Sequence, residues 1–283
     1  MTGGTGNVGR LVVEQLVAAG VDVRVMSRRP RADRPGGVEV VPGDLAEPDS
    51  LGPALRGVDR MYLFPYAATA PQVVALAGRA GVRRIVTLSS GAVTTGYDTN
   101  FHLPVEQAVE ASGLEWTHVR PGEFMLNTLW LWGPSIRAER VVRDPFPDWA
   151  GHPVHERDVA DVATVALLGE GHEHRAYTLN GPAWISRREQ IQSIAGAIGA
   201  DIRLEVVTPA RARELYLAQG GFAAASADFL TGFESYSGGD EAVVDAPVAD
   251  APADTSLTTA QDVTGRPART FAAWARDHAG DFR

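Results

Sequence analysis

Three glycines near the amino terminus, Gly3, Gly6 and Gly9, recur at every third position and run directly into an amphipathic segment. Glycines in a loop that opens a helix allow a tight turn, close approach of the backbone to a pyrophosphate, and close packing of the helix on a sheet. The helix amino terminus then offers amides and the positive end of its dipole to the phosphates. The loop therefore predicts a dinucleotide-binding site, with a purely structural turn as the alternative.

The strand that should precede this loop is missing, because only Met1 comes before Thr2. In a doubly wound sheet that first strand is central. One hypothesis is that the natural start lies upstream, so that the first strand is truncated. The other is a sheet built differently at that edge. The intact mass of the native protein would separate the two.

Beyond the loop, the first 130 residues alternate between short β-branched segments and helical patterns, which is typical of βαβ units. Strands are expected at residues 21–26, 38–41, 59–64, 83–88 and 115–119. Helices are expected at residues 8–19, 49–55, 72–80 and 104–111, with Gly20 and Gly81 as left-handed caps. The pattern predicts an α/β fold with a Rossmann-type doubly wound parallel sheet.

After residue 150 the pattern is less regular, with a helix expected at 158–168 and strands at 175–179 and 203–207. Ser186 and Glu189 form a capping box for a helix to about residue 198. Thr208, followed by a proline, starts another helix, and residues 269–278 predict a closing one. We expect residues 1–150 to form an NAD(P)-binding Rossmann domain. Residues 151–283 should form a small C-terminal α/β lobe, interleaved with the sheet, to which the family resemblance described below assigns the substrate.

Composition limits the chemistry, because all 26 basic residues are arginines and the chain has neither lysine nor cysteine. Schiff bases, a P-loop lysine and a Tyr-x-x-x-Lys pair are excluded, since arginine keeps its proton in proteins. Disulfides, thiolate nucleophiles and cysteine-bound metals are excluded as well.

The acidic balance, a net charge of −9, argues against a general nucleic-acid binder. No apolar segment reaches the 18 or so residues that span a bilayer, and the start of the chain lacks a signal-peptide pattern. We therefore expect no nucleic-acid partner, no membrane, a cytoplasmic location, and a monomer or homodimer that acts on a small molecule.

The identity of the dinucleotide is predicted from the end of the second expected strand, about 20 residues past the glycines, where NAD sites place a carboxylate on the ribose. This chain has Arg28 and Arg29 there, after Ser27. Guanidinium groups bind a 2′-phosphate, which a carboxylate would repel. NADP is therefore favoured over NAD, unless these arginines are merely solvated. Asp44 and Leu45 follow the third expected strand and would lie near the adenine.

The chain resembles the NmrA-like branch of the atypical short-chain dehydrogenase/reductases over nearly its whole length. The matching segments are TGGTGNVG at residues 2–9, GDL at 43–45, VRRIVTLSS at 82–90, SGLEWTHVRPGEFMLN at 112–127, and TGRPARTF at 264–271 with Trp274 after it. The resemblance implies a Rossmann-type domain, a small substrate lobe, and an NAD(P)-dependent oxidoreductase or, in some members, a sensor without turnover. By position, it implies a cofactor site lined by Gly3, Thr5, Gly6, Asn7, Val8, Gly9, Arg28, Asp44, Ser89 and Ser90, with Pro121 and Gly122 beside the nicotinamide.

Typical short-chain dehydrogenases protonate the substrate with a tyrosine whose pKa is lowered by a lysine, and a lysine-free chain excludes that pair. Since the cofactor carries the hydride chemistry, the protein needs only to position the reactants and supply one proton. Tyr97, His102 and Glu123 are the candidate donors. His102 is a candidate because imidazoles in general titrate close to working pH, and Glu123 because a carboxyl in an apolar pocket has a raised pKa. The structural alternatives are a helix-entry residue for His102 and a first-turn acid for Glu123.

Residues 124–132 are apolar nearly all round, which predicts either plain core or the wall of a pocket for a planar substrate. In the second case Phe124, Asn127 and Trp130 would contact substrate. The histidines of HPVH at 152–155 and HEH at 172–174 lack helical spacing and a third ligand, so no metal is expected.

The leading interpretation is an NADPH-dependent oxidoreductase that reduces a small, mostly apolar carbonyl, quinone or enone without a Tyr/Lys pair. The alternatives are a non-catalytic NADP-sensing regulator and a non-redox dehydratase or isomerase on the same scaffold.

Overall fold

A computed structural model describes residues 1–30, 38–233 and 258–283 of the chain. It divides into two compact units between which the chain passes repeatedly. Unit 1 comprises Met1–Gly122, Glu156–Leu179 and Thr258–Pro267, and unit 2 comprises Glu123–His155, Asn180–Leu257 and Ala268–Arg283. The expected boundary between residues 150 and 151 does not coincide with this division. Residues 123–150 belong to unit 2, while residues 156–179 return to unit 1.

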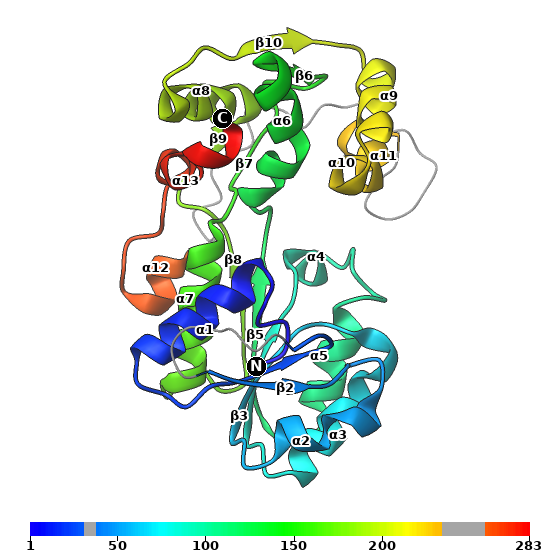
Figure 1. Cartoon of the computed structure of the whole chain (residues 1–283), viewed down its shortest axis with the longest axis vertical. Coiled ribbons are helices and arrows are strands. Elements are labelled where there is room, and N and C mark those ends of the chain that lie inside the picture. The colour runs from blue at the N-terminus through cyan, green and yellow to red at the C-terminus, as the bar shows by residue number, and fades with distance from the viewer. Residues whose placement is uncertain (31–37, 234–257) are drawn as a thin grey trace. The chain divides into compact units, whose positions relative to one another are not determined.

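The sheet of unit 1 is parallel, as the βαβ pattern predicts. Four strands pair in the order β3, β4, β5 and β8, and β1 pairs with β2 (Figure 1). Their bounds are Arg24–Ser27 for β1, Glu39–Pro42 for β2, Arg60–Leu63 for β3, Arg84–Leu88 for β4, Glu115–Pro121 for β5 and Arg175–Leu179 for β8. The expected strand at 175–179 coincides with β8, whereas the one at 21–26 begins only at Arg24.

The first two residues lie between β1 and β3, where the central strand of such a sheet is expected. Met26 donates its amide to the Met1 carbonyl at 2.9 Å, and Thr2 donates its amide to the Tyr62 carbonyl at 3.0 Å. The Thr2 hydroxyl also accepts the Phe64 amide at 2.7 Å. Met1 and Thr2 therefore join β1 to β3 by backbone hydrogen bonds, although they are too short to form a strand.

Helices cover both faces of this sheet, which makes it doubly wound. In unit 1, α1 packs against α7, which also contacts α12, while α3 packs against α5 (Figure 1). Their bounds are Asn7–Ala18 for α1, Gly52–Leu55 for α2, Ala70–Arg79 for α3, Gly91–Thr94 for α4, Leu103–Glu110 for α5, Glu156–Leu168 for α7 and Ala260–Thr264 for α12. The expected helix at 49–55 is a 3-10 turn, Pro48–Leu51, that continues into α2. Gly20 and Gly81 have φ of 73° and 99°, which confirms both left-handed caps.

Unit 2 is mostly helical, with two small strand pairs. β6 (Val141–Asp144) pairs in parallel with β10 (Arg203–Val206), and β7 (Ala150–Gly151) pairs antiparallel with β9 (Ile185–Ser186). Its helices are α6 (Leu126–Glu139), α8 (Arg187–Ile198), α9 (Pro209–Gln219), α10 (Gly221–Ala225), α11 (Ala227–Leu230), α13 (Phe271–Asp277) and the 3-10 turn η3 (Ala279–Phe282).

Local signals set the helix starts of unit 2. Ser186 and Glu189 form the expected capping box on α8, and the Thr208 hydroxyl accepts the Arg211 amide at the start of α9. The hydrophobic core of the unit is centred on α6, α8 and α13, with Trp132, Ile194 and Trp274 buried.

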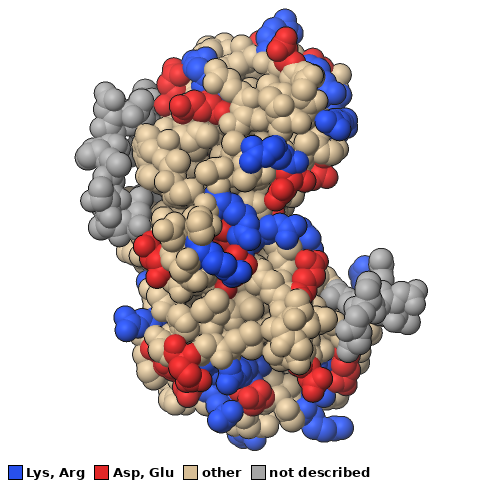
Figure 2. All heavy atoms as spheres, turned by 90° about the vertical axis from the view of Figure 1, so that its left-hand side faces the viewer, with Lys and Arg blue, Asp and Glu red and all other residues tan. Residues whose placement is uncertain are grey.

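Acidic and basic side chains are interspersed on the face of the molecule drawn in Figure 2. Within the described part of the chain, none of the helices combines the length and the apolar character needed to cross a bilayer.

Candidate functional site

The glycine loop of unit 1 is packed so tightly that side chains are excluded. A Cβ atom at Gly9 would lie 2.2 Å from the carbonyl oxygen of Gly3, well inside van der Waals contact. The amide of Gly6 donates to that same carbonyl at 2.9 Å, and Gly3 itself has a φ of 60°. The first turn of α1 therefore lies directly on the loop, which explains why glycine is required at both ends of the motif.

The loop leaves the amino terminus of α1 open to a ligand. Gly6 is the N-cap residue, and no side chain among the described residues caps the helix there. Thr5, Gly6 and Asn7 are exposed above the loop, while Val8 and Gly9 are buried beneath it. Exposed amides at the start of a twelve-residue helix, over a cradle that a Cβ would fill, fit a pyrophosphate.

The arginines that were expected to select the 2′-phosphate lie at the carboxyl end of β1. Arg28 and Arg29 are both exposed and follow the last residue of the strand, Ser27. The Arg29 amide donates to the Ser27 hydroxyl at 3.2 Å, which stabilises the turn that displays the two side chains. Both guanidinium groups can therefore reach a ligand at the carboxyl edge of the sheet.

Asp44 and Leu45 follow β2 at the same edge, but each is engaged in the loop itself. The Asp44 carboxylate accepts the Ala46 amide at 3.0 Å, and the Ser50 hydroxyl accepts the Asp44 amide at 2.9 Å. The Leu45 side chain is buried in the core of unit 1. Any cofactor contact made by Leu45 would therefore come from its backbone.

Four further expected residues lie at the carboxyl ends of β4 and β5. Ser90 is the N-cap of α4, and its hydroxyl accepts the Ala92 amide at 3.2 Å. The Ser89 amide donates to the Val119 carbonyl at 2.7 Å, which joins the two strand ends. A Cβ at Gly91 would lie 3.3 Å from the Pro121 carbonyl and 3.4 Å from the Gly122 Cα, so α4 packs closely on the expected nicotinamide face.

Two aromatic residues at this edge were not predicted from the sequence. Phe64 and Tyr66 follow β3 and are 43% and 41% exposed, and the Phe64 side chain would contact a Cβ at Gly3. Phe64 therefore lies beside the glycine loop, while Tyr66 is exposed two residues further along the chain. The sequence contained a signal for them, because aromatic residues that directly follow a parallel strand lie at its carboxyl end, where ligands bind.

A buried ion pair supports the end of β5. Nε and Nη2 of Arg120 donate to the two carboxylate oxygens of Glu106 on α5, at 2.9 and 2.5 Å. Burial alone would raise the pKa of Glu106, but the hydrogen bonds from Arg120 lower it below its usual value. Nη1 of Arg120 also donates to the Thr94 hydroxyl of α4 at 3.2 Å. Arg120 thus links β5, α5 and α4 immediately before Pro121.

His102 is held by a partner that the sequence analysis missed. Its Nδ1 lies 2.5 Å from Oδ2 of Asp98, in the loop between α4 and α5. Oδ1 of Asp98 accepts the amides of Phe101 and His102, each at 3.0 Å. Burial raises the pKa of Asp98, but the hydrogen bonds from the imidazole and the two amides outweigh that effect and lower it. Asp98 and His102 are four residues apart, and this spacing was the signal in the sequence that could have paired them.

The other two expected proton donors lie in different surroundings. Tyr97 precedes Asp98 in unit 1 and is 53% exposed. Glu123 is the first residue of unit 2, where its carboxylate lies close to Gly151. Burial raises the pKa of the Glu123 carboxyl, while the positive charge of Arg187 opposes that rise. Arg187 is itself paired with Asp144, with Nη1 3.0 Å from each carboxylate oxygen.

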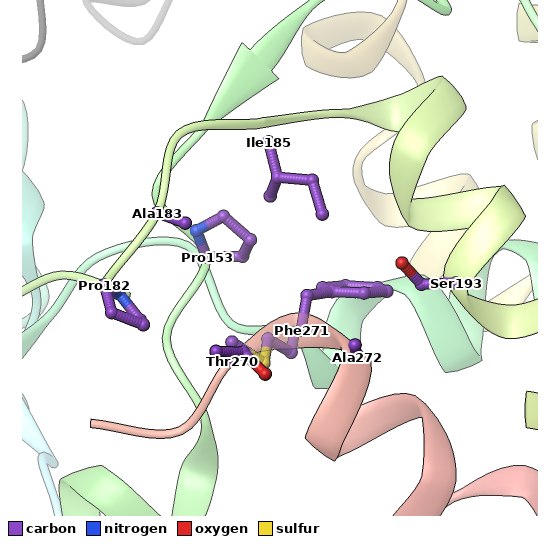
Figure 3. Close-up of a pocket in the computed structure, with 9 residues that line it drawn as sticks. Pro153, Pro182, Ala183, Ile185, Ser193, Thr270, Phe271 and Ala272 are labelled. Carbon is purple, nitrogen blue, oxygen red and sulfur yellow. The ribbon is translucent and has the colours of Figure 1, made fainter. Parts of the chain in front are cut away.

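The apolar segment at 124–132 mostly forms core. Leu126, Leu131 and Trp132 are buried in the core of unit 2, and Phe124 packs against it. Trp130 is 39% exposed and faces Phe222, with ring centroids 5.5 Å apart, and the Asn127 amide donates to the Phe124 carbonyl. Unit 2 also contains a small cavity (Figure 3), but Met125 lines it rather than Phe124, Asn127 or Trp130.

One cluster among the described residues has the composition of a metal site. Ligand atoms of Glu106, Glu110 and His118 lie within 4.8 Å of one another. Both oxygens of Glu106 already accept hydrogen bonds from Arg120, whose positive charge disfavours a cation at that place. The cluster is better described as the Arg120–Glu106 ion pair with Glu110 and His118 beside it. The histidines of HPVH and HEH form no such cluster within the described residues.

Comparison with known proteins decides between a structural turn and a dinucleotide site. A family model described as NAD(P)H-binding matches residues 3–169, which is more than half of the chain and includes the whole glycine loop. The chain belongs to this NAD(P)H-binding family. The match extends through α7, so the segment that returns to unit 1 belongs to the family's domain as well.

Two curated relatives cover the whole chain. It is similar to the (4-alkanoyl-5-oxo-2,5-dihydrofuran-3-yl)methyl phosphate reductase of Streptomyces griseus, with 41% identity over 100% of this chain and 98% of the relative. It is also similar to the NAD(P)H azoreductase of Xenophilus azovorans, with 32% identity over 100% and 98%.

Among solved structures, the triphenylmethane reductase of Citrobacter sp. has a TM-score of 0.77 at 20% identity, covering 98% of this chain and 97% of that one. The NADPH-dependent quinone oxidoreductase of Escherichia coli, solved with NADPH, has a TM-score of 0.73 at 20% identity and covers 98% of each chain. At this identity the structural likeness establishes the fold. The predicted Rossmann-type fold, the resemblance to NmrA-like atypical short-chain dehydrogenase/reductases, the NAD(P)-type cofactor and the oxidoreductase class are all confirmed.

Proposed function

We propose that this protein uses NADPH to reduce the carbon–carbon double bond of a small enone, such as an acylated dihydrofuranone. The observation that carries the proposal is the 41% identity, over the full chain, to a reductase named for an alkanoyl dihydrofuranone phosphate. In such a compound the ring double bond is conjugated to carbonyl groups. It can therefore accept a hydride at its β-carbon.

In this reaction the cofactor supplies the hydride and the protein supplies the proton. The reduced nicotinamide supplies the hydride when it is bound. As the β-carbon receives that hydride, the electron pair of the double bond moves to the carbonyl oxygen and forms an enolate, which takes up one proton at the α-carbon. The protein must hold that proton and orient its donor.

His102 is the best proposed donor among the three candidates, because its Nδ1 is held by Asp98 at 2.5 Å. Its side chain is only 20% exposed, so the position of its ring is restricted. This arrangement commits the Nδ1 proton to Asp98 and leaves Nε2 as the nitrogen that can exchange a proton with a ligand. Glu123, whose pKa is raised by burial, is the second candidate. Tyr97 is the third, and the chain has no lysine to complete a Tyr/Lys pair.

The preference for NADPH is supported by Arg28 and Arg29, which are exposed just after β1, where a carboxylate would favour NADH. Both side chains can donate hydrogen bonds to a 2′-phosphate. The substrate lobe is proposed to be unit 2, which forms a compact unit apart from the glycine loop and the parallel sheet of unit 1.

The test is to titrate the full chain with NADPH and NADH and follow the quenching of tryptophan fluorescence. Oxidation of NADPH at 340 nm is then measured with acyl dihydrofuranones, simple enones, quinones and azo dyes. We expect tighter binding of NADPH and the fastest turnover with the acyl dihydrofuranones. NADPH binding with no oxidation by any acceptor would favour the sensor, and equal, weak binding of both dinucleotides would overturn the cofactor assignment.

A further inference from the structure

Unit 2 contains a cavity of about 130 Å³ between the start of α6, the segment before β9, and the helices α8 and α13 (Figure 3). We propose that this cavity binds a short alkyl chain carried by the substrate. The inference rests on the proposed function and narrows its substrate class to enones that bear a short alkyl or acyl substituent.

The walls of the cavity offer a ligand almost nothing but carbon. Met125, Ile185 and Phe271 contribute apolar side chains, and no charged side chain lines it. Two hydroxyls reach the wall, but both are occupied locally. That of Ser193 donates to the Glu189 carbonyl at 2.8 Å, and that of Thr270 accepts the Ala273 amide at 3.3 Å. A polar ligand would lose its hydration here without gaining partners, whereas an alkyl group would gain from leaving water.

One wall is fixed by an unusually close backbone contact. A Cβ at Gly181 would lie 1.9 Å from the Pro153 carbonyl oxygen, and the Gly181 amide donates to the His152 carbonyl at 2.9 Å. This contact fixes the position of Pro153 relative to Pro182, the residue after Gly181, and both prolines line the cavity. The glycine and the two prolines therefore keep the space open in the absence of a ligand.

The opposite wall is equally well supported. Phe271 and Met125 are 4% and 1% exposed and belong to the core of unit 2, so neither can collapse into the cavity without leaving its packing. Figure 3 shows the Phe271 ring across the cavity from Ile185 and Pro153. The rim is open, because Ala183 and Ala272 are both exposed. A chain can thus enter from solvent with its far end against buried carbon.

The volume limits what the cavity can hold. An apolar cavity of about 150 Å³ accommodates benzene, so by proportion this one holds about five carbon atoms. A short alkyl chain has about this number of atoms, whereas a fused ring system has too many to fit. Each methylene buried should improve binding about fourfold until the cavity is full.

The first test does not depend on turnover. The chain has four methionines, and only Met125 lines the cavity, since Met1, Met26 and Met61 lie in unit 1. Methyl-¹³C-methionine labelling of the full chain should therefore give one reporter and three internal controls. We expect 1-pentanol to shift the Met125 methyl resonance saturably and leave the Met26 and Met61 resonances unchanged. A Met125 resonance that stays unchanged would overturn the inference.

The second test fills the cavity. Ala272→Leu should abolish the Met125 shift, whereas Ala210→Leu, at an exposed alanine of α9 away from the cavity, should preserve it. Ala183→Leu, on the other side of the rim, is the second plug if the first variant folds poorly by circular dichroism. A Met125 shift that persists in both plugged variants would place the alkyl chain elsewhere and overturn the inference.

The third test uses turnover. For acyl dihydrofuranones of increasing chain length, kcat/KM should rise about fourfold per methylene up to about five carbons and then level off. In Ala272→Leu the dependence on chain length should vanish, whereas the Ala210→Leu control should keep both the dependence and the turnover of the unaltered protein. Turnover that is independent of chain length in the unaltered protein would overturn the alkyl-chain inference and leave the proposed function intact. A saturable Met125 shift without any turnover would remove the proposed function and support the cavity's preference for alkyl groups.

Discussion

Asp98 holds His102 with both oxygens of its carboxylate: Oδ2 lies 2.5 Å from the imidazole Nδ1, and Oδ1 accepts the amide of His102 itself at 3.0 Å. One acid therefore fixes both the ring and the backbone that carries it. In a chain without lysine, this pair provides an oriented, titratable group at the start of α5.

Disrupting the pair should slow turnover without preventing cofactor binding. Since a positioned acid contributes about 100-fold or more, His102→Gln should lower kcat of enone reduction by about that factor. Asp98→Asn should lower it roughly tenfold, because the imidazole remains but is less well oriented, and should change the pH profile of kcat. The dissociation constant for NADPH, measured by fluorescence, should stay the same.

A second His–Asp pair provides the matched control. In unit 2, Nδ1 of His278 lies 2.8 Å from Oδ2 of Asp281. Asp281→Asn removes a comparable hydrogen bond from a comparable imidazole and should leave kcat and its pH profile unchanged. If both Asp→Asn variants behave alike, Asp98 has no special function in the reaction.

Arg28 and Arg29 should determine the choice of dinucleotide. Removing one charge-assisted hydrogen bond costs about 1.5–3 kcal/mol, so Arg28→Ala and Arg29→Ala should each weaken NADPH binding roughly 10- to 100-fold. NADH has no 2′-phosphate, and its dissociation constant should change by less than about twofold. Arg79→Ala, at an exposed arginine in the last turn of α3, is the control. Equal losses for NADPH and NADH would argue against the proposed contact.

Gly9 should tolerate no side chain. Because a Cβ there would lie 2.2 Å from the Gly3 carbonyl, Gly9→Ala must separate α1 from the loop. We expect a loss of about 1–3 kcal/mol in the free energy of unfolding together with impaired NADPH binding. Gly196→Ala, inside α8 with no atom within 4 Å of the added Cβ, should instead stabilise the protein by about 0.5–1 kcal/mol. Chemical denaturation measures both.

His118 should make the protein sensitive to acid. Burial lowers its pKa from 6.5 to about 4, with the positive charge of Arg120 adding to the effect and Glu106 opposing it. Between these two values the unfolded chain binds a proton that the folded chain does not, so the free energy of unfolding falls as pH falls through this window. The loss approaches about 3 kcal/mol at pH 4.

The contribution of His118 can be isolated by substitution. His118→Phe keeps an aromatic ring that can stack on Trp116, as the imidazole does at 4.5 Å, and removes the titration. In this variant the free energy of unfolding should fall by about 3 kcal/mol less between pH 6.5 and pH 4 than in the unaltered protein. His174→Asn is the control, because His174 is exposed and asparagine tolerates its φ of 58°. An unchanged pH dependence in His118→Phe would assign the acid sensitivity to other groups.

Much of unit 1 was determined by short-range sequence patterns. The glycine spacing, the alternation of strands and helices, and the caps at Gly20 and Gly81 each depend on backbone conformation within a few residues. The capping box at Ser186 belongs to the same class. The absence of lysine excluded the Tyr/Lys mechanism without any structural information.

The tertiary structure determined which distant segments of the chain contact one another. Met1 and Thr2 join β1 to β3 because both strands hydrogen-bond to them, and Arg120 pairs with Glu106 because β5 lies beside α5. The alkyl cavity is formed by four segments that are far apart in the sequence. Residue periodicity describes each element separately, whereas cavities and ion pairs arise when the burial of apolar surface brings distant elements together. The sequence alone could therefore identify the cofactor loop, and only the fold could provide the Arg120–Glu106 pair and the cavity.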